Sequence, residues 1–165
     1  MKILVFTEGT IIMHPSKVSL TREERVAQSK AKQRAVHKYR EYIPNGGAVE
    51  KLNKWKTQGC EIYYLTSRTT EKEINDVAYV LSTYGFPDNN NLLFRKSEEY
   101  KDVAEKLMPD ILVEDDCESI GGEVEMTYPH INENLKPRIK SIVVKEFGGI
   151  DHLPDNIKKL LNYKS

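Results

Sequence analysis

The sequence predicts a three-layer α/β/α domain of the Rossmann-like type, in which helices cover both faces of a parallel sheet. Short runs rich in β-branched and aromatic residues alternate along the chain with segments of helical periodicity, which is the order of elements in such a sheet. The 165 residues are 39% hydrophobic and 30% charged, a composition typical of a globular domain that buries its own core. We therefore expect a single domain over residues 1–165.

The first half of the predicted sheet comes from two strands, Lys2–Phe6 and Glu61–Leu65. Between them, residues 48–55 carry apolar side chains at helical spacing, and Gly59 follows at a position where helices commonly end. A capping box, Thr70 with Glu73, starts the next helix. The remaining predicted elements are the strands Leu92–Phe94, Ile111–Val113 and Ser141–Val144, with the helices Tyr100–Leu107 and Leu153–Leu161.

Residues 12–43 form a predicted helical insertion after the first strand. Thr21 and Glu24 make a capping box for a helix that we expect to run to about Tyr42. Between Lys17 and Arg40 there are eight basic and two acidic residues. This segment is either a solvated helix packed on one side or a small cap whose basic face attracts an anionic substrate. No aromatic residues interleave with the basic ones in a way that favours base stacking, so a nucleic-acid partner is not expected.

The overall composition excludes several classes of protein. Lys plus Arg and Asp plus Glu are both 25, so the net charge indicates no particular partner. No apolar run is long enough to cross a membrane, and the apolar start is broken by Thr7 and Glu8, which favours a strand over a signal peptide. Cys60 and Cys117 form no metal motif and no disulfide framework. A cytoplasmic protein is the simplest expectation.

Polar residues follow three of the predicted strands, at the ends where ligands bind in parallel sheets. They are Glu8 and Thr10 after the first strand, Thr66, Ser67 and Arg68 after the second, and Glu114, Asp115 and Asp116 after the fourth. Carboxylate oxygens are ligands that Mg²⁺ prefers, while hydroxyl and cationic groups bind phosphate oxygens. We expect these groups to converge on Mg²⁺ and a phosphorylated small molecule, although consecutive acids can also form a solvated turn.

In their order and spacing, these motifs resemble those of the haloacid dehalogenase superfamily of phosphotransferases. The resemblance extends from Met1 to the last predicted strand. It implies a Ser or Thr after the second strand, a lysine before the fourth and an acidic pair after it. Carried over, the catalytic roles fall on Glu8, Thr66 and Lys101 (with Lys96 as the second choice for the lysine), substrate binding on Thr10, Ser67 and Arg68, and Mg²⁺ on Glu8, Asp115 and Asp116.

The chain departs from that family at the nucleophile. The family motif is Asp-x-Asp-Gly-Thr, and Gly9 and Thr10 place Phe6 where the first aspartate stands and Glu8 where the second stands. A phenyl ring can neither attack phosphorus nor bind a metal. Thr7 would face the other side of a regular strand, so it replaces the nucleophile only if a bulge turns it. We expect the ring of Phe6 to point toward the acids.

Three functions are consistent with this pattern. The first is a phosphatase-like protein that binds Mg²⁺ and a phosphorylated small molecule with weak or no turnover. The second is an active phosphohydrolase in which metal-bound water attacks and Glu8 is the base. The third is an interaction module that kept the fold and lost the site.

Overall fold

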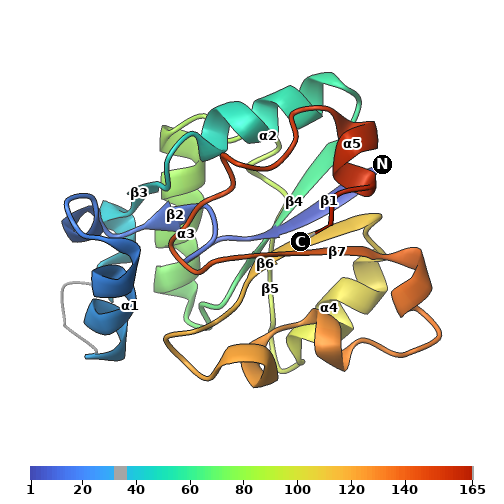
Figure 1. The fold of residues 1–165 in the computed structure, drawn as a ribbon. Coiled ribbons are helices and arrows are strands. Elements are labelled where there is room, and N and C mark those ends of the chain that lie inside the picture. Colours follow the sequence, from blue (N-terminus) through green and yellow to red (C-terminus); the bar gives the residue numbers. More distant parts are fainter. Residues whose placement is uncertain (32–36, 165) are drawn as a thin grey trace.

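A computed structural model gives the structure of residues 1–31 and 37–164, and its centre is a five-stranded parallel sheet (Figure 1). The strand order is β5-β4-β1-β6-β7, and every neighbouring pair is parallel. The strands are β1 (Lys2–Phe6), β4 (Glu61–Thr66), β5 (Leu92–Phe94), β6 (Ile111–Asp115) and β7 (Lys140–Val144). The predicted fold class is confirmed, and β4, β6 and β7 are one to two residues longer than their predicted runs.

The first strand, β1, lies in the middle of the sheet and is hydrogen-bonded on both sides. Its residues pair with β4 through Phe6 opposite Leu65, and with β6 through Val5 opposite Val113. Because side chains alternate along a strand, Ile3 and Val5 face one apolar layer and Leu4 faces the other. The carboxyl ends of the three central strands therefore meet at one edge of the sheet.

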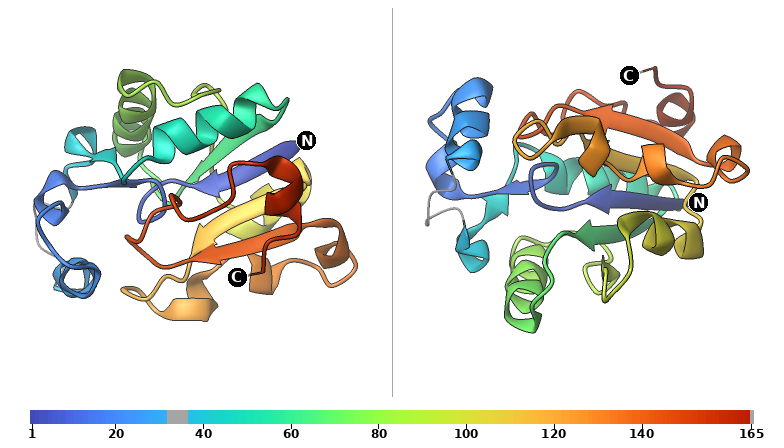
Figure 2. Two further views of the ribbon diagram at one scale, coloured as in Figure 1. Left: turned by 45° about the horizontal axis from the view of Figure 1, so that its top comes forward. Right: turned by 90° about the horizontal axis from the view of Figure 1, so that it is seen from below.

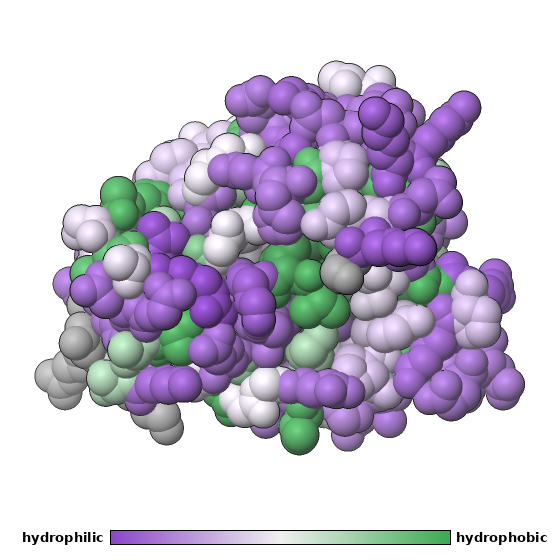
Figure 3. Space-filling view, viewed as in Figure 1, coloured by the Kyte–Doolittle hydropathy of each residue, from purple (hydrophilic) through white to green (hydrophobic). Residues whose placement is uncertain are grey.

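Helices cover both faces of the sheet, as the views in Figure 2 show. One layer contains α2 (Ala48–Thr57), α3 (Glu71–Thr83) and α5 (Ile157–Leu161), and the opposite layer contains α4 (Tyr100–Leu107) with short 3₁₀ turns at Gly122–Glu125, Tyr128–His130 and Lys136–Arg138. Trp55 on α2 is fully buried in the first layer. On the face shown in Figure 3, hydrophilic residues dominate, and apolar residues gather near the middle, where β7 forms the sheet edge.

The last helix, α5, is shorter than predicted. The apolar spacing predicted a helix from Leu153, but α5 begins at Ile157. Leu153 precedes Pro154, and a residue before proline is disfavoured in the helical region. The Asn156 side chain then caps the helix by accepting a hydrogen bond from the Lys159 N–H.

A two-stranded sheet joins the two ends of the segment between β1 and α2. Near the start of the segment, β2 (Ile12–Met13) pairs in antiparallel fashion with β3 (Ile43–Pro44) near its end. Between them lie a 3₁₀ turn at Pro15–Lys17, then α1 (Arg22–Lys30), and a second 3₁₀ turn at Tyr39–Glu41. None of the helices in the described ranges, 1–31 and 37–164, is long and apolar enough to span a membrane.

The prediction of one long helix up to Tyr42 is wrong. The capping box of Thr21 and Glu24 is present, but α1 ends at Lys30, and Tyr42 follows a 3₁₀ turn. Val26 is the one side chain that α1 buries, so the weak apolar stripe does little to stabilise a longer helix. Ala35, part of the predicted stripe, lies outside the described residues.

Lys17 anchors this insertion on the loop that follows β7. Its buried ammonium donates to the Arg25 carbonyl at 2.7 Å and to the Ser29 hydroxyl at 2.8 Å, and lies 4.2 Å from the centre of the Phe147 ring. Burial lowers the pKa of Lys17 to about 8, against the opposing attraction of Glu146. Arg25 also donates to the Phe147 carbonyl at 2.8 Å. The insertion is thus tied to the edge of the sheet where the candidate site lies.

Candidate functional site

The turn after β1 directs polar side chains to two sides of the sheet edge. Gly9 has a φ of 83°, and its N–H donates to the Ile12 carbonyl at 3.0 Å. A Cβ on Gly9 would lie 3.0 Å from an Asp115 oxygen and 3.3 Å from the Glu146 side chain, so glycine is required both by the backbone and by this close approach. On either side of Gly9, Glu8 reaches toward the end of β4 and Thr10 toward the end of β6.

At the end of β4, three residues surround the carboxylate of Glu8. The Thr66 hydroxyl donates to Glu8 Oε1 at 2.5 Å, the Ser67 N–H donates to Oε2 at 3.3 Å, and Arg68 Nε lies 3.6 Å from Oε1. The Thr7 hydroxyl donates to Oε2 at 2.7 Å. We call Thr66, Ser67 and Arg68 the anion cradle, because a hydroxyl, a backbone N–H and a guanidinium together hold one carboxylate.

Arg68 is fixed in this position by a residue from the insertion. Its guanidinium lies 4.4 Å from the centre of the Tyr39 ring and also donates to the Tyr39 hydroxyl. A second donor of the guanidinium reaches the Ser67 hydroxyl at 2.6 Å. The insertion therefore shapes the anion cradle even though it contributes none of the cradle's three residues.

A second cluster, of three carboxylates, lies at the ends of β6 and β7. Asp115, Asp116 and Glu146 each offer an oxygen, and these oxygens lie within 4.8 Å of one another. We call these residues the acid cluster. Glu8 is not part of it in the described structure, so the predicted grouping of Glu8 with Asp115 and Asp116 is replaced by one with Glu146.

Glu146 was missed by the sequence analysis, although a signal was present. It follows the strand predicted to end at Val144, and this strand lies next to β6 in the sheet. An acid after the neighbouring strand reaches the same edge as Asp115 when the two strands are parallel. The order of strands in the sheet, which the alternating pattern does not specify, was the missing information.

The charge on the acid cluster is only partly balanced by cations. Lys145 Nζ lies 3.0 Å from Asp116 Oδ2, and Arg22, which also pairs with Glu118, lies 3.9 Å from the same oxygen. Burial opposes ionisation, yet the pKa of Asp116 lies below its usual value because the Glu146 N–H and Lys145 stabilise the carboxylate. Among the residues that the structure describes, neither Asp115 nor Glu146 forms an ion pair.

Asp115 is the most strongly perturbed acid of the cluster. It is 6% exposed, accepts a hydrogen bond from the Thr10 hydroxyl at 2.7 Å, and accepts one from the Cys117 N–H at 3.0 Å. Burial, together with the charge of Glu146, raises its pKa to about 7 despite the hydrogen bond from Thr10. The buried carboxylates of Asp115 and Glu146 lie close together and have no cationic partner in the described structure. Oxygen ligands with uncompensated negative charge fit a divalent cation such as Mg²⁺.

Glu114, the acid before Asp115, has a different environment. It is buried and accepts hydrogen bonds from the backbone N–H groups of Thr127 at 2.6 Å and Tyr128 at 2.9 Å. Burial raises its pKa against these two hydrogen bonds. Its carboxylate positions the segment around residue 127 on the α4 side of the sheet.

Phe6 is half-buried and its surroundings are apolar, which differs from the expectation that its ring leaves the apolar layer. Its ring packs in the apolar layer with Leu4 and Leu65, on the face of the sheet that α4 covers. The ring of Tyr100, at the start of α4, meets it edge-on with centroids 5.4 Å apart. Such pairs stabilise a fold by about 0.5–1.5 kcal/mol beyond the area they bury. The aromatic partner from α4 explains why the ring turns into the layer.

The hydroxyl of Tyr100 borders the anion cradle. Burial raises the pKa of Tyr100, and a hydrogen bond with Ser67 acts in the opposite direction. Lys101, the next residue, pairs with Glu99 at 3.1 Å, and Lys96 is exposed. In the described structure neither lysine forms an ion pair with Glu8 or with the acid cluster.

Thr7, the alternative nucleophile, is fully buried. Its hydroxyl donates to Glu8 and lies 3.3 Å from the Leu65 carbonyl, while its N–H donates to the same carbonyl at 3.1 Å. Thr7 is therefore part of the hydrogen bonding that joins β1 to β4.

Comparison with known proteins establishes the fold. No protein-family model and no curated protein matches the sequence. Among solved structures, the class C acid phosphatase from Bacillus anthracis is similar with a TM-score of 0.58 and 15% identity, over 99% of this chain and 79% of that chain. Its tungstate-bound form gives a TM-score of 0.53. A chain in the structure of the Pnkp1/Rnl/Hen1 RNA repair complex gives 0.56 at 15% identity, over 88% of this chain.

This chain spans only 42% of the length of that RNA repair chain. At 15% identity these likenesses show a shared fold, here the fold of an acid phosphatase. The acid cluster and the anion cradle lie at the edge of the sheet where ligands bind in parallel α/β proteins.

The position of Phe6 predicts how the chain responds to an aspartate there. Phe6→Asp places a carboxylate in the apolar layer and removes the contact with Tyr100, so we expect a loss of about 3–5 kcal/mol in the free energy of unfolding. Phe6→Leu keeps the site apolar and is expected to cost less than about 2 kcal/mol. Urea denaturation of the three proteins measures both effects. Equal stability of the two variants, with stronger Mg²⁺ binding by Phe6→Asp, would show that residue 6 faces the acids.

Proposed function

We propose that this protein is a phosphatase-like member of the haloacid dehalogenase superfamily that binds a divalent cation and a phosphorylated small molecule without forming a phosphoaspartate. The observation that carries the proposal is the packing of Phe6 against Tyr100, beside an intact anion cradle at the end of β4. The fold shared with an acid phosphatase supports the assignment to a phosphate-handling class. Residues 12–43 serve as a small cap within the single domain.

Glu8 acts in this proposal as an internal anion. Its carboxylate accepts hydrogen bonds from Thr66 and Ser67 and lies beside Arg68, which are donors of the kind that bind phosphate oxygens. A phosphoryl group binds the cradle by displacing this carboxylate. The displacement lowers the affinity for the ligand, because the donors must first give up a charge-assisted partner.

The acid cluster is the proposed cation site. Asp115, Asp116 and Glu146 would hold Mg²⁺, which would supply positive charge on the β6 side of the turn at Gly9. Thr10 positions Asp115 through its hydroxyl, and Ser119 holds Glu146 by donating from its N–H and hydroxyl, both at 2.6 Å. Because Lys145 already pairs with Asp116, the cation competes with an ammonium group for one of the three carboxylates and is bound weakly.

The cation site is tested by calorimetry with Mg²⁺. We expect a dissociation constant on the order of 1 mM for the wild type, at least about tenfold weaker binding for Asp115→Asn and Glu146→Gln, and no change for Glu123→Gln, an exposed acid outside the cluster. Equal heats for the wild type and Asp115→Asn would show that no cation binds there, and would favour an interaction module that kept only the fold.

The anion cradle is tested by phosphate binding. Because Glu8 competes for the cradle, Glu8→Ala should bind inorganic phosphate about tenfold more tightly than the wild type, and Arg68→Gln should bind it about tenfold more weakly. Two-dimensional NMR of the Ser67 amide resonance measures both. Weaker binding by Glu8→Ala would refute the internal-anion role.

The same proteins separate binding from turnover. We expect hydrolysis of an aryl phosphate with Mg²⁺ to stay at the level without enzyme in the wild type, because Phe6 offers no nucleophile. Steady Mg²⁺-dependent hydrolysis, lost in Glu8→Ala, would instead support the mechanism in which metal-bound water attacks and Glu8 is the base.

A further inference from the structure

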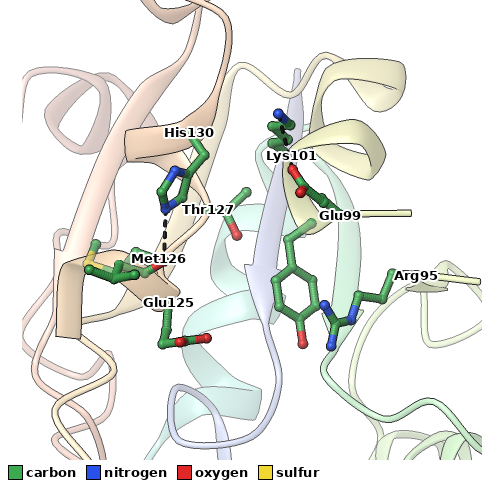
Figure 4. Close-up of a pocket in the computed structure, with 9 residues that line it drawn as sticks. Arg95, Glu99, Lys101, Glu125, Met126, Thr127 and His130 are labelled. Atoms are coloured by element: carbon green, nitrogen blue, oxygen red, sulfur yellow. Dashed lines mark hydrogen bonds and ion pairs between the residues drawn. The ribbon is translucent and has the colours of Figure 1, made fainter. Parts of the chain in front are cut away.

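A cavity of about 260 Å³ lies between α4 and the segment 124–130 (Figure 4), and no residue of the acid cluster lines it. One wall carries Arg95 and Lys101, and the other carries Glu125, Thr127 and His130; Tyr100 also lines the cavity. Its volume lies just below the range of about 300–1,000 Å³ that is typical of sites for drug-sized ligands, so it fits a small molecule. Nothing in the proposed phosphate or cation binding uses these walls.

The two walls carry opposite charges that do not neutralise each other. In Figure 4 the guanidinium of Arg95 and the carboxylate of Glu125 approach the cavity from opposite sides. Arg95 lies 4.4 Å from the centre of the Tyr100 ring, and in the described structure it forms no ion pair and no hydrogen bond. Glu125 likewise has no ion-pair partner among the described residues. A cation and an anion thus face one space while each remains open to a ligand.

The other charged groups of the cavity are already satisfied. Lys101 pairs with Glu99 at 3.1 Å, and the His130 ring lies within 2.8 Å of the Val124 carbonyl, which fixes it against its own wall. Arg95 and Glu125 are therefore the groups that define the charge pattern a ligand meets.

Buried and apolar groups complete the lining. Thr127 lines the cavity, but its hydroxyl is buried beside the carboxylate of Glu114 and offers no open partner to a ligand. Met126 and the Tyr100 ring supply apolar surface for the body of the ligand.

We propose that this cavity binds a small zwitterion, with its oxyanion on Arg95 and its ammonium group on Glu125. A simple anion would meet the repulsion of Glu125, and a simple cation that of Arg95, so both charges on one molecule are required for complementarity. The cavity borders the anion cradle through Tyr100, whose ring lines it and whose hydroxyl contacts Ser67. The inference does not depend on cation binding or on turnover.

The probes for the test carry the two charges either together or one at a time. O-phosphoethanolamine carries a phosphate and an ammonium group, β-alanine carries a carboxylate and an ammonium group, and inorganic phosphate and ethanolamine each carry one of the charges. Each is titrated into the ¹⁵N-labelled protein, and the amide resonances of Val124 and Thr127 report the cavity while that of Ser67 reports the cradle. The two zwitterions distinguish a phosphate from a carboxylate as the preferred oxyanion.

We expect at least one zwitterion to shift the cavity resonances with a dissociation constant of about 5 mM or tighter, and at least about tenfold more tightly than either single-charge probe. Arg95→Gln and Glu125→Gln should each weaken it by about tenfold, whereas Lys96→Gln and Glu123→Gln, neighbouring exposed residues that do not line the cavity, should change it less than about twofold. Binding that Glu125→Gln leaves unchanged, or no zwitterion binding up to about 50 mM, would overturn the proposal.

If inorganic phosphate shifts Ser67 but not Val124 or Thr127, the cradle and the cavity are separate sites. Phosphate binding at Ser67 with no zwitterion binding would then contradict the cavity alone. The reverse result would contradict the anion cradle and leave the cavity supported.

Discussion

The close approach of the turn at Gly9 to the end of β6 is the constraint on which the arrangement of the site depends. Gly9 adopts a positive φ, accepts a hydrogen bond from the Phe147 N–H at 2.7 Å, and leaves no room for a Cβ beside Asp115. The turn therefore joins β1 to the loops after β6 and β7. It also sends Glu8 and Thr10 to opposite sides, so that one polar edge contains an anion cradle and an acid cluster instead of a single centre.

The environment of Phe6 joins the apolar layer to the polar edge of the sheet. Phe6 belongs to the apolar layer and packs on Tyr100, and the Tyr100 hydroxyl extends that contact to the cradle. Glu8 accepts hydrogen bonds from Thr66 and Ser67 and forms an ion pair with Arg68, so its carboxylate occupies the cradle in the absence of a ligand.

The elements of the sheet could be predicted because each is encoded locally. Runs of β-branched residues form the strands. A capping box starts α1, and the side chain of Thr70 caps the start of α3 by accepting a hydrogen bond from the Glu73 N–H. The end of α1 could not be predicted, because the capping box starts a helix but the burial of Val26 alone does not prolong it. The predicted start of α5 was wrong for a local reason: Pro154 disfavours the helical conformation at Leu153, although the apolar spacing favours a helix there.

The site was harder to predict because it depends on distances between strands. Glu8, Thr66 and Asp115 were identified from their places at strand ends, but which of them meet depends on how the turn at Gly9 divides them. Glu146 required the strand order, and the orientation of Phe6 required knowledge that Tyr100 would lie beside it. Lys101 was expected at the site from the order of the motifs, but it forms an ion pair with Glu99 on the same helix turn.

The central claim is that no phosphoryl group is transferred to the chain, and trapping a covalent intermediate tests it most directly. The wild-type protein is incubated with an aryl phosphate and Mg²⁺, quenched in acid, and analysed by intact mass spectrometry and peptide mapping. Our account predicts an unmodified mass at every time point, because residue 6 is a phenylalanine and the Thr7 hydroxyl is buried in hydrogen bonds. A phosphoryl adduct that maps to the peptide containing β1 and its turn would contradict it.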